Sequence, residues 1–105
     1  MSTTTISPND PKTVLLEVAQ VVSNHTGVPA ADIIKRGRLG NVVIARFIAI
    51  EMLIELLPLL PIPVLAKLFN RTVGWARFAV EQKIVDARFR KIKQAIRHEL
   101  HQPTR

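Results

Sequence analysis

A long apolar stretch, residues 42–66, most constrains what this chain can fold into. It is long enough to span a bilayer, but it contains three charged residues and three prolines: Arg46, Glu51, Glu55, Pro58, Pro61 and Pro63. Each charge near a bilayer centre costs about 2.5–3.5 kcal/mol, which outweighs the gain from the leucines and isoleucines. We therefore expect no transmembrane segment. The stretch predicts a buried central helix over about 41–57, a rigid proline turn, and a second helix.

The N-terminal third also carries helical signals. Asp10 and Pro11 suit the N-cap and the first position of a helix over about 11–25. Its inward face is predicted from apolar residues at helical spacing: Val14, Val18, Val21 and Val22. Gly27 and Pro29 end this helix, and a short helix over about 30–34 follows.

After the proline turn we expect helices over about 64–70, 72–84 and 85–101, the last two either bent at Val85-Asp86 or fused. The predicted core residues of these segments and of the short helix before them are Ile33, Ile34, Leu65, Leu68, Phe69, Val73, Ala76, Val80, Ile84, Phe89, Ile92, Ile96 and Leu100. Ala66 is small enough for another helix to lie across it. The predicted fold class is therefore all-α, a compact bundle of five to six helices. It occupies residues 11–101, between a flexible lead (1–10) and a tail (102–105).

The charge balance predicts an acidic partner. The chain has 15 Lys+Arg against 8 Asp+Glu, a net charge of +7, which favours nucleic acid, an anionic membrane or an acidic protein. The absence of cysteine excludes disulfides, Cys-ligated zinc and a thiol nucleophile. The first residues lack the basic and apolar regions of a signal peptide, so we expect a cytoplasmic protein.

Two segments predict how DNA would be bound. The helix over 64–70, the tight connection Asn70-Arg71-Thr72 and the longer helix after it are typical of a helix-turn-helix, with Asn or Thr as the cap. The segment Lys35-Arg36-Gly37-Arg38-Leu39-Gly40 is a basic loop whose glycines let the backbone turn and approach a partner. Arg46 lies just beyond this loop, at the basic end of the central helix.

Residues 14–100 resemble the C-terminal DNA-binding domain (domain IV) of the bacterial replication initiator DnaA. Residues 31–38 (ADIIKRGR) are similar to that family's valine or alanine, aspartate, two aliphatics and basic loop. Residues 62–69 (IPVLAKLF) resemble its leucine-proline helix, and 79–84 (AVEQKI) its alanine, valine, lysine and isoleucine positions. The resemblance implies a Trp-repressor-like helix-turn-helix in which Arg38 enters the minor groove and Arg46 holds a phosphate.

The DNA-binding residues predicted from the loop, the connection and the resemblance are Lys35, Arg36, Arg38, Arg46, Pro63, Arg71, Thr72, Gly74, Trp75 and Arg77. The family's base-reading signature, an aspartate, a histidine and two threonines, is replaced here by Thr72-Val73-Gly74-Trp75. No G-x-x-x-x-G-K-[ST] motif occurs, so no nucleotide is expected. We expect a stand-alone, nucleoid-associated, double-stranded DNA-binding protein of bacterial or phage origin that regulates replication initiation or transcription. We expect it to have no enzymatic activity, cofactor or metal.

Several residues have competing interpretations. Trp75 is either a base contact or a core or dimer residue, and Gly74 allows close approach either to DNA or to another helix. Residues 88–97 carry a basic stripe that is either a solvated face or a set of extra phosphate contacts. His98 and His101 resemble a weak metal pair at a frayed end.

Two alternative functions are also considered. One is an initiator-like domain that binds a protein partner or dimerises through Trp75 and Phe78. The other is a membrane-surface protein that uses its basic last helix.

Overall fold

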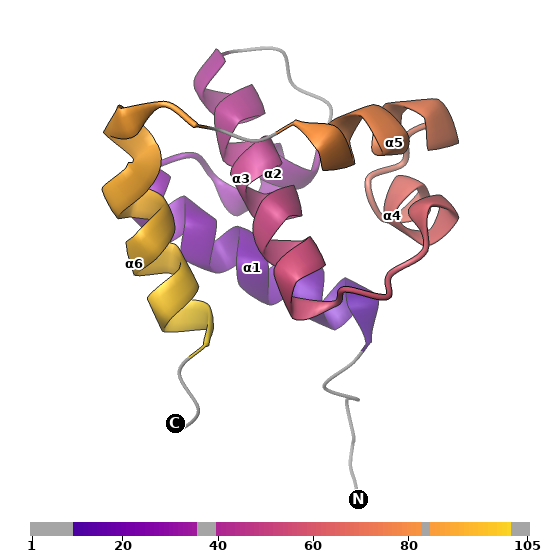
Figure 1. The fold of residues 1–105 in the computed structure, drawn as a ribbon, viewed down its shortest axis with the longest axis horizontal. Helices are drawn as coiled ribbons and strands as arrows, with labels where there is room; N and C mark the ends of the chain where they lie inside the picture. Colours follow the sequence, from indigo (N-terminus) through magenta and orange to yellow (C-terminus); the bar gives the residue numbers. More distant parts are fainter. Residues whose placement is uncertain (1–9, 36–39, 83–84, 102–105) are drawn as a thin grey trace, which may run out of the picture.

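The protein is an all-α bundle, as predicted. The structure, a computed structural model, describes residues 10–35, 40–82 and 85–101. Within these ranges it contains six α-helices, one 3-10 turn and no strand (Figure 1). The elements are α1 (Pro11–Thr26), α2 (Ala30–Ile34), α3 (Gly40–Leu56), α4 (Ile62–Leu68), α5 (Val73–Glu81), the 3-10 turn η1 (Ala87–Phe89) and α6 (Arg90–Leu100).

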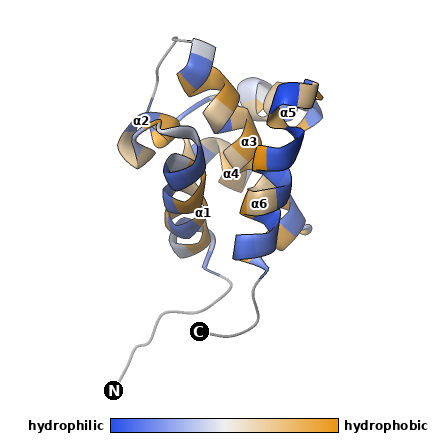
Figure 2. Ribbon diagram, turned by 90° about the vertical axis from the view of Figure 1, so that its left-hand side faces the viewer, coloured by the Kyte–Doolittle hydropathy of each residue, from blue (hydrophilic) through white to orange (hydrophobic). Residues whose placement is uncertain are grey.

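Helix α3 forms the centre of the bundle. It is apolar around most of its circumference, as expected of a helix enclosed by others, and α1, α2 and α5 all pack against it. Figure 2 shows α3 as a largely apolar helix, whereas α1 and α6 carry hydrophilic outer faces. The residues that α3 contributes to the core are Val42, Ala45, Ile48, Ala49, Ile50, Met52 and Leu53.

Helix α1 has the predicted buried face and the predicted ends. The four valines expected to point inward are all buried, and Val18 and Val22 are fully inaccessible. The Asp10 carboxylate accepts from the Thr13 hydroxyl at 2.9 Å. Gly27 ends the helix in the left-handed conformation, with φ of 81°, which glycine adopts without a steric cost.

Helix α5 differs from the prediction in length and in its buried face. It ends at Glu81, because Gln82 has extended backbone with ψ of 123°; the predicted end at Ile84 lies outside the described residues. Val73 was expected in the core but is 41 % exposed. Ala76 is buried as predicted and Val80 packs partly buried against the core. Ala79, which was not predicted, is also buried, and the small side chains of the two alanines let α5 pack close to α3.

The last predicted helix is divided. Asp86 has extended backbone, and its carboxylate accepts from the Arg88 backbone N–H at 2.9 Å, which caps the short turn η1. Helix α6 then begins at Arg90 and packs against α1. Its apolar face is as predicted, with Ile96 fully buried. Three flanking residues pack against the core while partly exposed: Phe89, Ile92 and Leu100.

Candidate nucleic-acid interface

The connection between α4 and α5 is a defined hydrogen-bonded turn. Asn70 takes a left-handed conformation with φ of 52°, which asparagine tolerates better than most residues. The Arg71 N–H donates to the Ala66 carbonyl at 2.9 Å, and the Asn70 N–H donates to the Lys67 carbonyl at 3.1 Å. These two bonds are the pattern of a Schellman motif, which ends α4 and reverses the chain within four residues.

Thr72 is the N-cap of α5, one of the two caps considered from the sequence. Its hydroxyl accepts from the Trp75 N–H at 3.1 Å, which satisfies one of the otherwise unpaired donors at the helix start. Thr72 itself is exposed. Helix α5 therefore begins at the surface, with its first turn fixed by the Thr72 hydroxyl.

The Trp75 ring is half-buried between two neighbours. The Phe69 ring lies 5.7 Å from it, centroid to centroid, and the Arg71 guanidinium lies over its face at 4.7 Å. Contacts of this kind favour a fixed ring and a fixed guanidinium. The contacts with Phe69 and Arg71 agree with the interpretation of Trp75 as a core residue. Contact of Trp75 with a DNA base stays a prediction. The Trp75 ring also orients the Arg71 guanidinium, which lies over its face.

Arg46 lies in an environment that the sequence did not indicate. We expected it to hold a phosphate, but its side chain is only 3 % exposed. Its guanidinium donates to the carbonyls of Ile33 (2.8 Å), Asp32 (2.9 Å) and Lys35. These are carbonyls at the C-terminal end of α2, where a helix lacks partners and attracts positive charge. In this geometry Arg46 caps α2, and the expected phosphate contact stays a prediction.

Burial and a neighbouring cation both act against the charge of Arg46. Burial lowers the pKa of the Arg46 guanidinium below its ordinary value; the Arg71 charge lowers it further, and Asp32 opposes both. Arg46 thus bonds to the Lys35 carbonyl, where the basic loop starts, and is repelled by the charge of Arg71, just before α5. The loop residues Arg36 and Arg38 lie outside the described residues.

The outer face of α5 is exposed over most of its length. Its exposed residues are Val73, Gly74, Arg77, Phe78 and Glu81. A Cβ atom added at Gly74 would meet only the Thr72 Oγ1, at 3.9 Å. Close packing against another described helix, one of the two reasons considered for this glycine, is therefore absent. Pro63, also among the predicted contacts, is exposed in the first turn of α4.

The basic stripe of α6 is partly neutralised by α3. The Arg97 guanidinium makes two bonds of 2.8 Å to the Glu55 carboxylate and lies 3.6 Å from Glu51. Lys93 Nζ lies 3.1 Å from Glu51 Oε1, an ion pair outside hydrogen-bond geometry. The matching i, i+4 spacing of the two acids and the two bases is a sequence signal for this pairing that our prediction missed.

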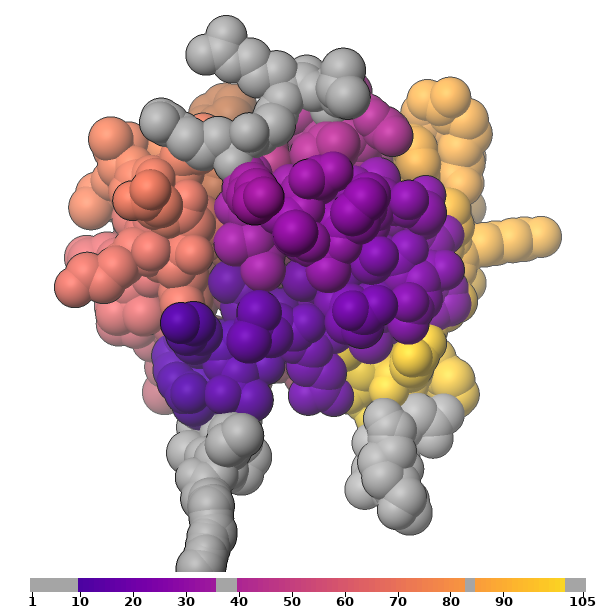
Figure 3. All heavy atoms as spheres, turned by 180° about the vertical axis from the view of Figure 1, so that it is seen from behind, coloured from indigo at the N-terminus to yellow at the C-terminus, as the bar shows by residue number. Residues whose placement is uncertain are grey.

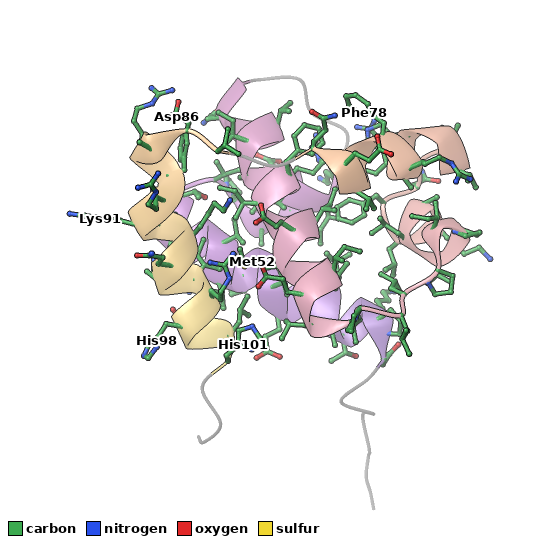
Figure 4. All side chains as sticks on the ribbon, viewed as in Figure 1. Met52, Phe78, Asp86, Lys91, His98 and His101 are labelled. Atoms are coloured by element: carbon green, nitrogen blue, oxygen red, sulfur yellow. The ribbon has the colours of Figure 1, made fainter. Side chains whose placement is uncertain are left out.

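The remaining candidate groups lie elsewhere. His98 and His101 are at the C-terminal end of α6 (Figure 4), and His25 Nε2 lies 2.9 Å from Glu99 Oε1. Among residues 10–35, 40–82 and 85–101, no three His, Asp or Glu side chains gather as a metal site would require. No helix in these ranges is long and apolar enough to cross a membrane.

No protein-family model, curated protein or solved structure matches this chain. The resemblance to the initiator domain therefore depends on the sequence motifs alone. The fold and the site define a basic, all-α protein with an exposed helix start flanked by arginines.

Proposed function

We propose that this chain binds double-stranded DNA, with α4 and α5 acting as a helix-turn-helix and the basic loop contacting the adjacent groove. One observation carries the proposal. The Arg46 guanidinium bonds to the Lys35 carbonyl, and the like charge of Arg71 is near enough to lower the pKa of Arg46, so the start of the loop and the residue before α5 both lie near this guanidinium. A duplex at α5 would then meet both segments.

Gly74 supports the proposal independently. It has no positive φ and no intramolecular neighbour that a side chain would displace, yet glycine costs about 1 kcal/mol relative to alanine inside a helix. Close approach of a phosphate backbone to the first turn of α5 accounts for a residue without a side chain at this position. The backbone N–H groups of a helix start also attract phosphate.

The proposed role is binding rather than catalysis. The carboxylates of Glu51 and Glu55 form ion pairs with Lys93 and Arg97 of α6. Phosphate contacts by the loop and by α5 would supply the affinity, and the Thr72-Val73-Gly74-Trp75 segment predicts a sequence preference different from the initiator box. A bacterial or phage regulator of replication or transcription, acting in the cytoplasm at the nucleoid, fits these properties.

A salt titration of duplex binding tests the proposal. We expect log K to fall linearly with log salt concentration, with a slope of about −0.9 for each phosphate neutralised. The triple variant Lys35→Ala, Arg71→Ala, Arg77→Ala should flatten this slope by about one for each phosphate-contacting residue removed. The matched control is Lys91→Ala, an exposed cation on α6 that points away from α5 (Figure 4). A slope near zero, or equal slopes for the triple variant and the control, would refute DNA binding through this face.

The emission of Trp75 gives a second reading, because it is the single tryptophan of the chain. Duplex bound at the start of α5 should change its intensity in proportion to occupancy, since Arg71 would leave the ring for a phosphate or be held more tightly against it. Binding with unchanged emission would point to a surface away from α5.

A protein-interaction role is the second candidate, favoured by Phe78. This side chain is 54 % exposed although its ring touches Phe47 edge-on, with centroids 6.4 Å apart. If α5 is a dimer surface instead, sedimentation should show a dimer that Phe78→Ser converts to monomer, and duplex should not bind even at low salt.

A further inference from the structure

A trough on the surface opposite to that seen in Figure 1 is not used by the proposed DNA-binding face. It has a volume of about 370 Å³ and lies between the first half of α1 and α4, with the end of α2 beside it. Figure 3 views this face, with the indigo start of α1 next to α4. The described residues that line it are Lys12, Leu15, Leu16, Ile34, Val64, Lys67 and Leu68.

The trough has an apolar floor that is open to solvent. Leu16 is 53 % exposed and Val64 is 37 % exposed, one on each of the two helices that border it. A partner that covers these two side chains would gain the hydrophobic contribution of the apolar area removed from water. A pocket for a small molecule buries about 70–90 % of the surface of its ligand. Because Leu16 and Val64 are this exposed, the trough is too open to enclose a small molecule in that way.

The charges at the rim define the partner. Lys12 stands on α1 and Lys67 on α4, both exposed, and the lining residues include no acidic side chain. A partner with one carboxylate, such as a fatty acid, would neutralise one of the two lysines. A helix with an apolar stripe and acidic residues on both flanks would fill the floor and meet both lysines.

We propose that the trough between α1 and α4 is the docking site for an acidic amphipathic helix of a partner protein. The apolar stripe of that helix packs on Leu16 and Val64, and its acidic flanks pair with Lys12 and Lys67. Ile34 at the edge of the trough immediately precedes Lys35. A helix docked here would therefore lie close to bound DNA without using the same side chains, although the proposal does not depend on DNA binding.

The test is selection of a displayed library of random 16-residue peptides against the full chain, followed by binding of the enriched peptides by fluorescence anisotropy. We expect enriched peptides to be acidic and amphipathic, and to shift the methyl NMR signals of Leu16 and Val64. Charge reversal by Lys12→Glu with Lys67→Glu should weaken them about tenfold or more, and Leu16→Glu should weaken them further. Lys91→Glu, an exposed lysine away from the trough, should leave affinity unchanged.

Three outcomes would overturn the proposal. One is enrichment of basic or non-helical peptides; another is a set of methyl shifts outside the trough. The third is no enriched peptide together with binding of phosphatidylglycerol vesicles that the double reversal abolishes, which would assign the surface to lipid. Unchanged circular dichroism of each variant excludes unfolding as the cause. Loss of peptide binding by Leu16→Glu, a change on α1 outside the helix-turn-helix, with the duplex salt slope intact separates this site from the DNA-binding face.

Discussion

Replacing Arg46 by methionine separates the two roles assigned to this residue. Methionine has a similar shape but no donors, so the variant would leave the carbonyls of Ile33, Asp32 and Lys35 without their present partner. Hydrogen bonds to a charged group contribute about 1.5–3 kcal/mol each. The full sum is an upper bound, because the lowered pKa of Arg46 shows that burial opposes its charge, and water can reach the end of α2.

We therefore expect Arg46→Met to lower the free energy of unfolding by about 3 kcal/mol. In a domain of this size that corresponds to a fall in Tm of about 10–25 °C. Hydrogen exchange should accelerate at the amides of α2, because a helix of five residues is not stable without its tertiary contacts. Arg46→Lys should recover part of the loss, since an ammonium retains the charge but cannot reach three carbonyls in the same geometry.

A phosphate-binding role for Arg46 predicts a different result for the same variant. If Arg46 turned outward and held a phosphate, Arg46→Met would leave Tm within the range of an exposed control such as Lys91→Met, and would reduce the salt slope of DNA binding by about one. An unchanged Tm with a reduced slope would refute the capping role. A lower Tm with accelerated exchange in α2 would support it, and weaker DNA binding would then follow indirectly through the position of Lys35.

Three further predictions concern single contacts. Gly74→Ala should stabilise the fold by about 0.5 kcal/mol, because the added Cβ makes only an ordinary van der Waals contact with the Thr72 Oγ1, and should weaken duplex binding; stronger or equal binding would contradict a close approach of DNA to this residue. A double-mutant cycle with Glu55→Gln and Arg97→Met, measured by urea denaturation, should give a coupling of about 0.5–1 kcal/mol for the bond between α3 and α6, and no coupling would mean that the pair does not hold α6. Bonds from Arg88 lower the pKa of Asp86 below its ordinary value of 3.8, so its stabilising contribution is present at neutral pH and lost as pH falls below that value. Asp86→Asn should accordingly be less stable than the parent chain at neutral pH but not in acid, and an equal deficit at both would exclude the ion pair.

Much of the fold was predictable because local signals and burial agreed. Helix α1 has a proline at its start, a glycine at its end and a four-valine inner face, and all three features occur where the sequence predicted them. Helix α5 was harder to predict. Its apolar residues cover more than one face, so periodicity alone could not tell whether Val73 or the smaller Ala79 faced α3.

The site was less predictable because arginine has two common roles that local sequence does not separate. An arginine next to a basic loop resembles a phosphate contact, yet the same spacing places Arg46 opposite the unpaired carbonyls of α2. Only the packing of α2 against α3 decides between them. The two roles are also connected, because a buried cation that fixes the start of the basic loop determines where the loop's own charges lie. Variants of Arg46 must therefore be assessed by stability before their DNA binding is interpreted.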